Sequence, residues 1–182
     1  MEVLHYAELF GSDINGLLVS GSPANSTSLR LQTFCVVHAL KLSMAIKGRA
    51  HRSQFYHNLV YKGLSLSRDE NIEQEYLADP YCGSLCTMEY IHEMLSGSYH
   101  ITRKEHLSTI PKQLPMYFFA GEKDPIGGTK SIPLFDSYKK AGIKNVSYKV
   151  YKGALHETLN EINKEEVYQD TYDWMIGLLN IK

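Results

Sequence analysis

The chain has 182 residues, 43% of them apolar, which is enough for one globular domain, or for a core with a sizeable insertion. Nineteen Lys and Arg side chains against twenty Asp and Glu leave a formal charge of −1. This balance excludes a strong electrostatic attraction to nucleic acid or to an anionic bilayer. We expect no nucleic-acid partner, and we expect any lipid preference to come from a pocket.

The three cysteines indicate a compartment rather than a binding site. Cys35, Cys82 and Cys86 are an odd set without a charged-then-apolar leader before them, which favours a reducing, cytoplasmic setting. Cys82 and Cys86 are spaced C-x3-C, but no second Cys or His pair follows at zinc-site spacing. We expect them to be small buried hydrophobic residues, and we expect no metal and no cofactor.

Two further classes of protein are disfavoured by the absence of their motifs. No phosphate-binding glycine motif follows a predicted strand, which argues against a nucleotide site. No run approaches the roughly 18 continuous apolar residues that a membrane span requires, so we expect no transmembrane segment.

Apolar spacing predicts alternating helices and strands at the two ends of the chain. Residues 3–10 predict a short amphipathic helix, and residues 14–20 predict a strand buried on both faces. Residues 116–120 predict a second buried strand, and the alternation at 146–150 predicts a third strand nearer a sheet edge. Helices are predicted at 133–141 and after residue 163. This order indicates an α/β fold with a parallel sheet.

Residues 25–108 interrupt this alternation with a Ser/Asn/Thr-rich start, helical stretches and few strand signals. We interpret residues 1–24 and 109–182 as the core, and residues 25–108 as a mostly helical cap or lid insertion. Its apolar residues would suit the acyl chain of a lipid, although core packing explains most of them equally well. They are Leu29, Phe34, Val36, Val37, Leu40 and Leu42.

Asp124 and His156 each follow a predicted strand within a few residues. In an open parallel sheet the functional groups gather beyond the carboxyl ends of the strands, so neighbouring strands would bring these two residues together. A carboxylate that accepts the Nδ1 proton of an imidazole fixes its tautomer and stabilises the imidazolium that forms in catalysis. From spacing alone, a turn-forming Asp before Pro125 and an ordinary polar His explain the pair equally well. None of the other seven histidines directly follows a predicted strand; they are His5, His38, His51, His57, His92, His100 and His106.

Several segments together carry a resemblance to a known family. They are residues 13–22, LSRD at 66–69, YLADPYCG at 76–83, residues 114–128, YKGALHE at 151–157 and residues 160–174. In this combination the chain resembles the C-terminal part of the monoacylglycerol lipase and lysophospholipase group of α/β-hydrolases, which is sometimes classified with serine aminopeptidases. The resemblance covers nearly all of the chain. It implies an incomplete α/β-hydrolase fold, in which Asp124 is the triad acid and His156 the triad base.

The chain departs from that family at the nucleophile. Family members place the serine on a G-x-S-x-G turn immediately before the helix that here begins at Met1, and their oxyanion-hole loop lies earlier still. The 182 residues contain no such motif. Ser20 and Ser22 follow the wrong strand for this turn, so we expect neither to be the nucleophile. The strand at 14–20 would keep an unpaired edge, suited to an N-terminal half or to a second copy of the chain.

Three interpretations of function remain. The first is the C-terminal part of a serine hydrolase acting on monoacylglycerol or lysophospholipid-like esters, which supplies acid and base and is close to inactive alone. The second is a non-catalytic binding or assembly module derived from an α/β-hydrolase. The third is an unrelated α/β module, which a large separation between Asp124 and His156 would favour.

Overall fold

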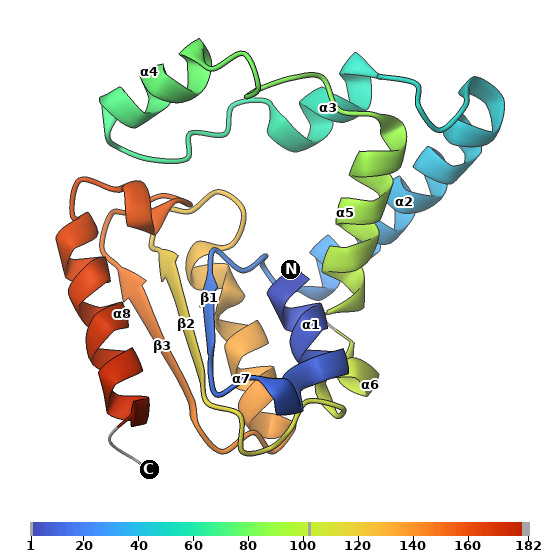
Figure 1. The fold of residues 1–182 in the computed structure, drawn as a ribbon. Coiled ribbons are helices and arrows are strands. Elements are labelled where there is room, and N and C mark those ends of the chain that lie inside the picture. The colour runs from blue at the N-terminus through green and yellow to red at the C-terminus, as the bar shows by residue number, and fades with distance from the viewer. Residues whose placement is uncertain (1, 102, 180–182) are drawn as a thin grey trace.

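A computed structural model describes residues 2–101 and 103–179. Its centre is a three-stranded parallel sheet of order β1-β2-β3, made of β1 (Leu17–Ser20), β2 (Met116–Gly121) and β3 (Val146–Tyr151) (Figure 1). The α/β prediction is confirmed, and β3 lies at one edge of the sheet as predicted. The strand expected at 14–20 is shorter and begins at Leu17.

Helices cover both faces of the sheet and extend beyond one end of it. Figure 1 shows α8 on one face, α1 and α7 on the other, α3 and α4 beyond the carboxyl ends of the strands, and α6 beside α1. The helices are α1 (Glu2–Phe10), α2 (Thr27–Lys47), α3 (Gln54–Tyr61), α4 (Glu70–Ala78), α5 (Met88–His100), α6 (Lys104–Leu107), α7 (Ile132–Lys140) and α8 (Lys164–Leu179). Short 3-10 turns lie at η1 (Gly11–Asp13), η2 (Gly128–Ser131) and η3 (Thr158–Asn160).

The central strand β2 is apolar throughout because both of its faces are covered. Successive side chains of a strand point to opposite faces. Phe118 therefore packs with α1 and α7, stacking on Phe135 at a ring-centroid distance of 4.7 Å. Tyr117 points to the other face and stacks on Trp174 of α8 at 5.8 Å. The sheet is thus the middle of three layers.

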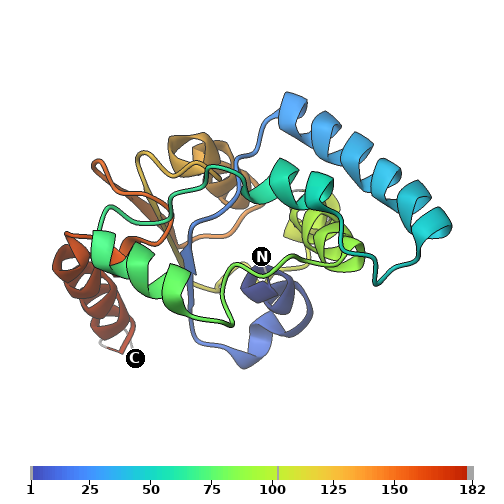
Figure 2. The same ribbon diagram turned by 90° about the horizontal axis from the view of Figure 1, so that it is seen from above.

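The segment between β1 and β2 has an apolar cluster of its own. Leu40 of α2, Tyr56 of α3, and Met88 and Ile91 of α5 are buried together. Cys86 packs against this cluster, but Cys86 and Cys82 are only half-buried, so the expectation that both are buried is wrong. They lie on the loop between α4 and α5, where fewer elements cover them. Seen from above, α2 extends to one side of the sheet (Figure 2).

The long helix α2 differs from what its apolar residues suggested. Leu40 is buried and Val36 packs beside it, but Phe34 and Leu42 are 46% and 66% exposed. Over the described residues, α2 is the one helix long enough and apolar enough to cross a membrane, with a mean hydropathy of 1.2. Length and composition alone do not establish a transmembrane segment, because helices of soluble proteins meet the same criterion. A search for a continuous apolar run misses this helix because polar residues interrupt it.

The packing of β2 makes a prediction about stability. Phe118→Ala removes a fully buried ring and is expected to lower the free energy of unfolding by about 3–5 kcal/mol. Phe55→Ala, the same change at a ring that is 69% exposed, is expected to change the free energy of unfolding by no more than about 0.5 kcal/mol. Urea denaturation of both variants measures the difference, and equal losses would contradict the assignment of β2 as the core strand.

Candidate active site

The register of β2 and β3 brings two loops together at the carboxyl end of the sheet. Gly121 pairs with Tyr151 at the ends of these strands. Beyond them, the backbone N–H of Glu122 donates to Tyr151 O at 2.9 Å, and the N–H of Lys123 donates to Ala154 O at 2.9 Å. A Cβ atom at Gly121 would lie 2.0 Å from Leu155 O, so only glycine allows this approach.

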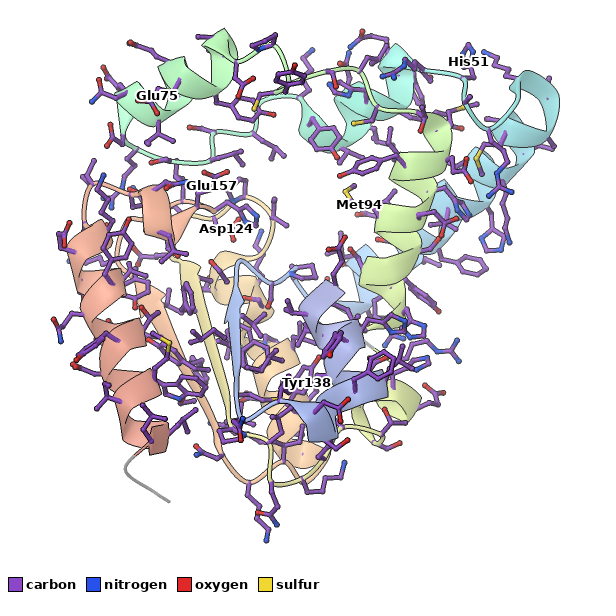
Figure 3. The ribbon with its side chains drawn as sticks, in the orientation of Figure 1. His51, Glu75, Met94, Asp124, Tyr138 and Glu157 are labelled. Carbon is purple, nitrogen blue, oxygen red and sulfur yellow. The ribbon has the colours of Figure 1, made fainter. Side chains whose placement is uncertain are left out.

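Asp124 and His156 meet where these loops touch. Asp124 Oδ2 lies 3.0 Å from His156 Nδ1, and Asp124 Oδ1 accepts the backbone N–H of Ile126 at 2.8 Å. The carboxyl side chain is fully buried, whereas 26% of the His156 side chain is exposed. In this arrangement Nδ1 donates to the carboxylate and Nε2 is left to accept a proton. The wide separation that would favour an unrelated module is not found, and Figure 3 shows Asp124 at this end of the sheet.

The ionisation of Asp124 reflects two opposing effects. Burial raises the pKa of Asp124, because it disfavours the charged carboxylate. The hydrogen bond and positive charge of His156 lower this pKa, and the backbone N–H groups of Ile126 and Gly127 lower it further. The net pKa lies below its usual value of 3.8, so the carboxylate is charged at neutral pH.

The end of β1 passes directly beside the imidazole ring of His156. Gly21 has φ +60°, and a Cβ atom there would lie 2.5 Å from His156 Cε1, so the glycine lets the chain pass against the imidazole ring. Ser22 is 3% exposed, and its hydroxyl has no hydrogen-bond partner among the described residues. Ser20 Oγ lies 3.4 Å from Thr158 Oγ1. That neither serine is the nucleophile stays a prediction.

A buried carboxylate after the histidine loop ties that loop to the helical segment. Glu161 is fully buried, and its oxygens accept the backbone N–H of Leu155 at 2.6 Å and the Nε–H of Arg68 at 2.8 Å. Arg68 also donates from Nη2 to Asn163 Oδ1 at 2.7 Å. Burial of a charged side chain destabilises a fold strongly unless the charge is paired and hydrogen-bonded, as the carboxylate of Glu161 is here.

Two further hydrogen bonds strengthen this link. The hydroxyl of Ser67 donates to Asn160 O at 2.7 Å, and the backbone N–H of Glu157 donates to Leu66 O at 2.8 Å. The residue after His156 is therefore held directly by the segment before α4. Sequence reasoning did not assign a role to Arg68 or Glu161. Both residues lie in segments that carry the family resemblance, LSRD at 66–69 and Asn160-Glu161. They are 93 residues apart in the sequence, so no local pattern pairs them.

A buried acid and a histidine at the ends of adjacent parallel strands, below a helical segment, define the C-terminal part of an α/β-hydrolase fold. The family model described as "Serine aminopeptidase, S33" matches residues 2–163. The chain therefore belongs to this family. No match is found among curated proteins.

Solved structures share this fold at low sequence identity. A thermostable carboxyl esterase from Bacillus coagulans, in complex with glycerol, has a TM-score of 0.77 at 19% identity, over 98% of this chain and 60% of its own. A monoacylglycerol lipase from Paleococcus ferrophilus has a TM-score of 0.69 at 20% identity, and the match covers 97% of this chain and 64% of the lipase chain. A soluble variant of the monoglyceride lipase of Saccharomyces cerevisiae has a TM-score of 0.74 at 17% identity, and the match covers 97% of this chain and 58% of the lipase chain. The chain thus spans about 60% of the length of the first of these structures.

The lowered pKa of Asp124 predicts how stability depends on pH. A carboxyl group whose pKa is lower in the folded chain stabilises the fold above its unfolded pKa, and this contribution is lost as the pH falls through the folded pKa. The stability difference between the wild type and Asp124→Asn should be greatest above about pH 5 and should shrink towards about pH 3. Urea denaturation across this range measures it. The exposed Asp13→Asn is the control, and a pH-independent difference for Asp124→Asn would contradict the pairing.

The link through Glu161 makes a second prediction. Glu161→Gln keeps the shape of the side chain but removes its charge. It should lower the free energy of unfolding by about 1–3 kcal/mol and speed amide exchange at Leu155. Glu165→Gln, at an exposed position in the first turn of α8, should change the free energy of unfolding by no more than about 0.5 kcal/mol. Unfolding and hydrogen exchange measure both effects. Equal behaviour of the two variants would show that Glu161 does not hold the histidine loop.

Proposed function

We propose that this chain supplies the acid and the base of a serine hydrolase that acts on lipid esters of the monoacylglycerol or lysophospholipid type. The observation that carries this proposal is the 3.0 Å contact between Asp124 and His156 at the carboxyl ends of adjacent strands. Membership of the family supports the reaction class. The esterase and lipases of similar fold support a small ester as the substrate.

In the proposed reaction, His156 Nε2 takes the proton of a serine hydroxyl while the serine attacks the ester carbonyl. Asp124 holds the Nδ1 proton and stabilises the imidazolium. His156 then returns the proton to the leaving alcohol, and activates the water that releases the acyl group. The 182 residues contain no G-x-S-x-G motif, so this serine and the oxyanion hole come from outside them. The chain alone is accordingly close to inert.

The first strand and helix are where the remaining part of such an enzyme would attach. Within the described residues, β1 is hydrogen-bonded to another strand only on its β2 side. Beside it, α1 exposes four large apolar side chains by 45–60%: Val3, Tyr6, Leu9 and Phe10. An unpaired strand edge next to an apolar surface favours addition of a further strand. We propose an N-terminal hydrolase half as this partner.

We further propose that residues 25–108 are the lid over this site. The contacts of Arg68 and Ser67 with the histidine loop support this role, since they place the segment above the catalytic pair. The three free cysteines support a reducing, cytoplasmic compartment.

The direct test is ester hydrolysis by the product of the complete reading frame that contains these residues. With p-nitrophenyl butyrate and monoolein as substrates, His156→Ala should lower kcat by roughly 10⁴–10⁶, and Asp124→Asn by roughly 10⁴. His38→Ala removes an exposed imidazole whose ring contacts Phe34 of its own helix, and should leave kcat unchanged. Full activity in His156→Ala would refute the proposal.

The 182-residue chain alone provides the complementary result. A fluorophosphonate probe, which reacts with activated serines, should not label it. Labelling at Ser20 or Ser22 would overturn the view that the nucleophile lies outside these residues. A complete reading frame without G-x-S-x-G, and without hydrolysis, would instead identify a non-catalytic module.

A further inference from the structure

Three histidines from three helices surround one buried carboxylate, on the side of the sheet that α1 and α7 cover. His5 Nδ1 lies 3.0 Å from Glu8 Oε2, and His100 Nε2 lies 3.1 Å from the same oxygen. His106 Nδ1 lies 3.7 Å from it. His5 and Glu8 share one face of α1 because they are three residues apart, while His100 ends α5 and His106 belongs to α6.

Glu8 is the least expected member of this cluster. Its side chain is only 3% exposed, and Oε1 has no hydrogen-bond partner among the described residues. The nearby hydroxyl of Tyr138 is also buried and unpartnered, and burial together with the negative charge of Glu8 raises the pKa of this phenol. A buried carboxylate that is incompletely hydrogen-bonded requires a compensating positive charge.

The three imidazole rings pack closely against one another beside Glu8. The rings of His100 and His106 stack with centroids 3.5 Å apart, and His5 meets His100 edge to face at 4.9 Å. A metal ion bound between these side chains would supply the positive charge that the buried carboxylate of Glu8 requires.

Two of the three ligand-atom separations match those around a single metal ion. The ligand atoms of His5, Glu8 and His100 all lie within 4.8 Å of one another. Around a tetrahedral Zn²⁺ with bonds of about 2.0–2.1 Å, ligand atoms are about 3.3 Å apart. The two distances to Glu8 Oε2, 3.0 and 3.1 Å, are close to this value.

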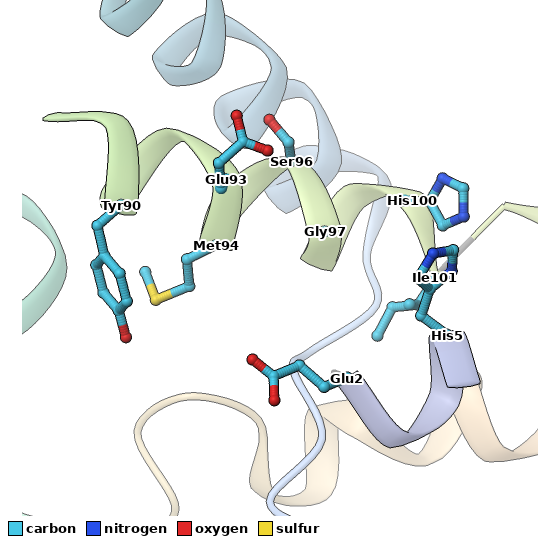
Figure 4. A pocket seen from close by; sticks show the side chains of 9 residues that line it. All are labelled: Glu2, His5, Tyr90, Glu93, Met94, Ser96, Gly97, His100 and Ile101. Carbon is cyan, nitrogen blue, oxygen red and sulfur yellow. The ribbon is translucent and has the colours of Figure 1, made fainter. Parts of the chain in front are cut away.

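We propose that His5, Glu8 and His100 form a binding site for a divalent transition-metal ion of the zinc class. Two imidazole nitrogens and a carboxylate oxygen are a ligand set that Zn²⁺ accepts, with water completing the coordination. Figure 4 shows His5 and His100 together at one end of a cavity of about 580 Å³, which gives the ion a path from solvent. Neither Asp124 nor His156 lines this cavity.

The test is Zn²⁺ binding by the full 182-residue chain, measured by equilibrium dialysis. We expect one Zn²⁺ per chain. His100→Ala and Glu8→Gln should each weaken binding at least tenfold, since loss of even the hydrogen-bond partner of a ligand costs roughly 10- to 100-fold. The control is His51→Ala, which removes an exposed imidazole outside the cluster and should leave the affinity unchanged. Equal affinity in wild type and His100→Ala would overturn the site.

A measurement on the wild type keeps the proposal testable if a variant fails to fold. Co²⁺, which adopts the same coordination and absorbs visible light, should give the intense d–d bands of a four-coordinate site. Zn²⁺ should abolish these bands and should raise the Tm of the chain. Absence of the bands, together with an unchanged Tm in Zn²⁺, would show that the cluster is a hydrogen-bond network only.

Discussion

The parallel pairing of β2 with β3 is the constraint on which the candidate active site depends. It aligns the ends of two strands so that the loops that follow are hydrogen-bonded to each other, as in the bond from Lys123 to Ala154. A shift of β3 by one residue in this register would exchange the side chains on its two faces and displace His156 from Asp124. The same pairing requires glycine at position 121, because the backbone of the histidine loop occupies the space of a side chain.

Above this pair, the histidine loop is tied to the helical segment by the ion pair of Arg68 with the buried Glu161 and by two further hydrogen bonds. Glu161 connects Leu155, the neighbour of His156, with Arg68 of the helical segment. The neighbours of His156 on both sides, Leu155 and Glu157, are therefore connected to that segment. The proposed lid and the proposed base are thus parts of one hydrogen-bonded unit.

The sequence predicted the features that depend on local patterns. The run at 116–120 is apolar without interruption because β2 is buried on both faces, and Asp124 and His156 could be found because each follows its strand closely. The sequence did not predict partners that meet only after folding. Arg68 and Glu161 are 93 residues apart, and Glu8 and His100 are 92 apart. The exposure of Phe34 and Leu42 on α2 could not be predicted, because apolar spacing alone does not say which side of a helix another element covers.

The central claim is that Asp124 accepts the Nδ1 proton of His156, and proton NMR of this bond tests it most directly. A proton held between an imidazole and a buried carboxylate exchanges slowly and resonates at unusually low field. We predict such a resonance in the wild-type chain, coupled to His156 Nδ1 in a ¹⁵N-labelled sample and lost in Asp124→Asn. Its absence from the wild type, or its persistence in Asp124→Asn, would contradict the account.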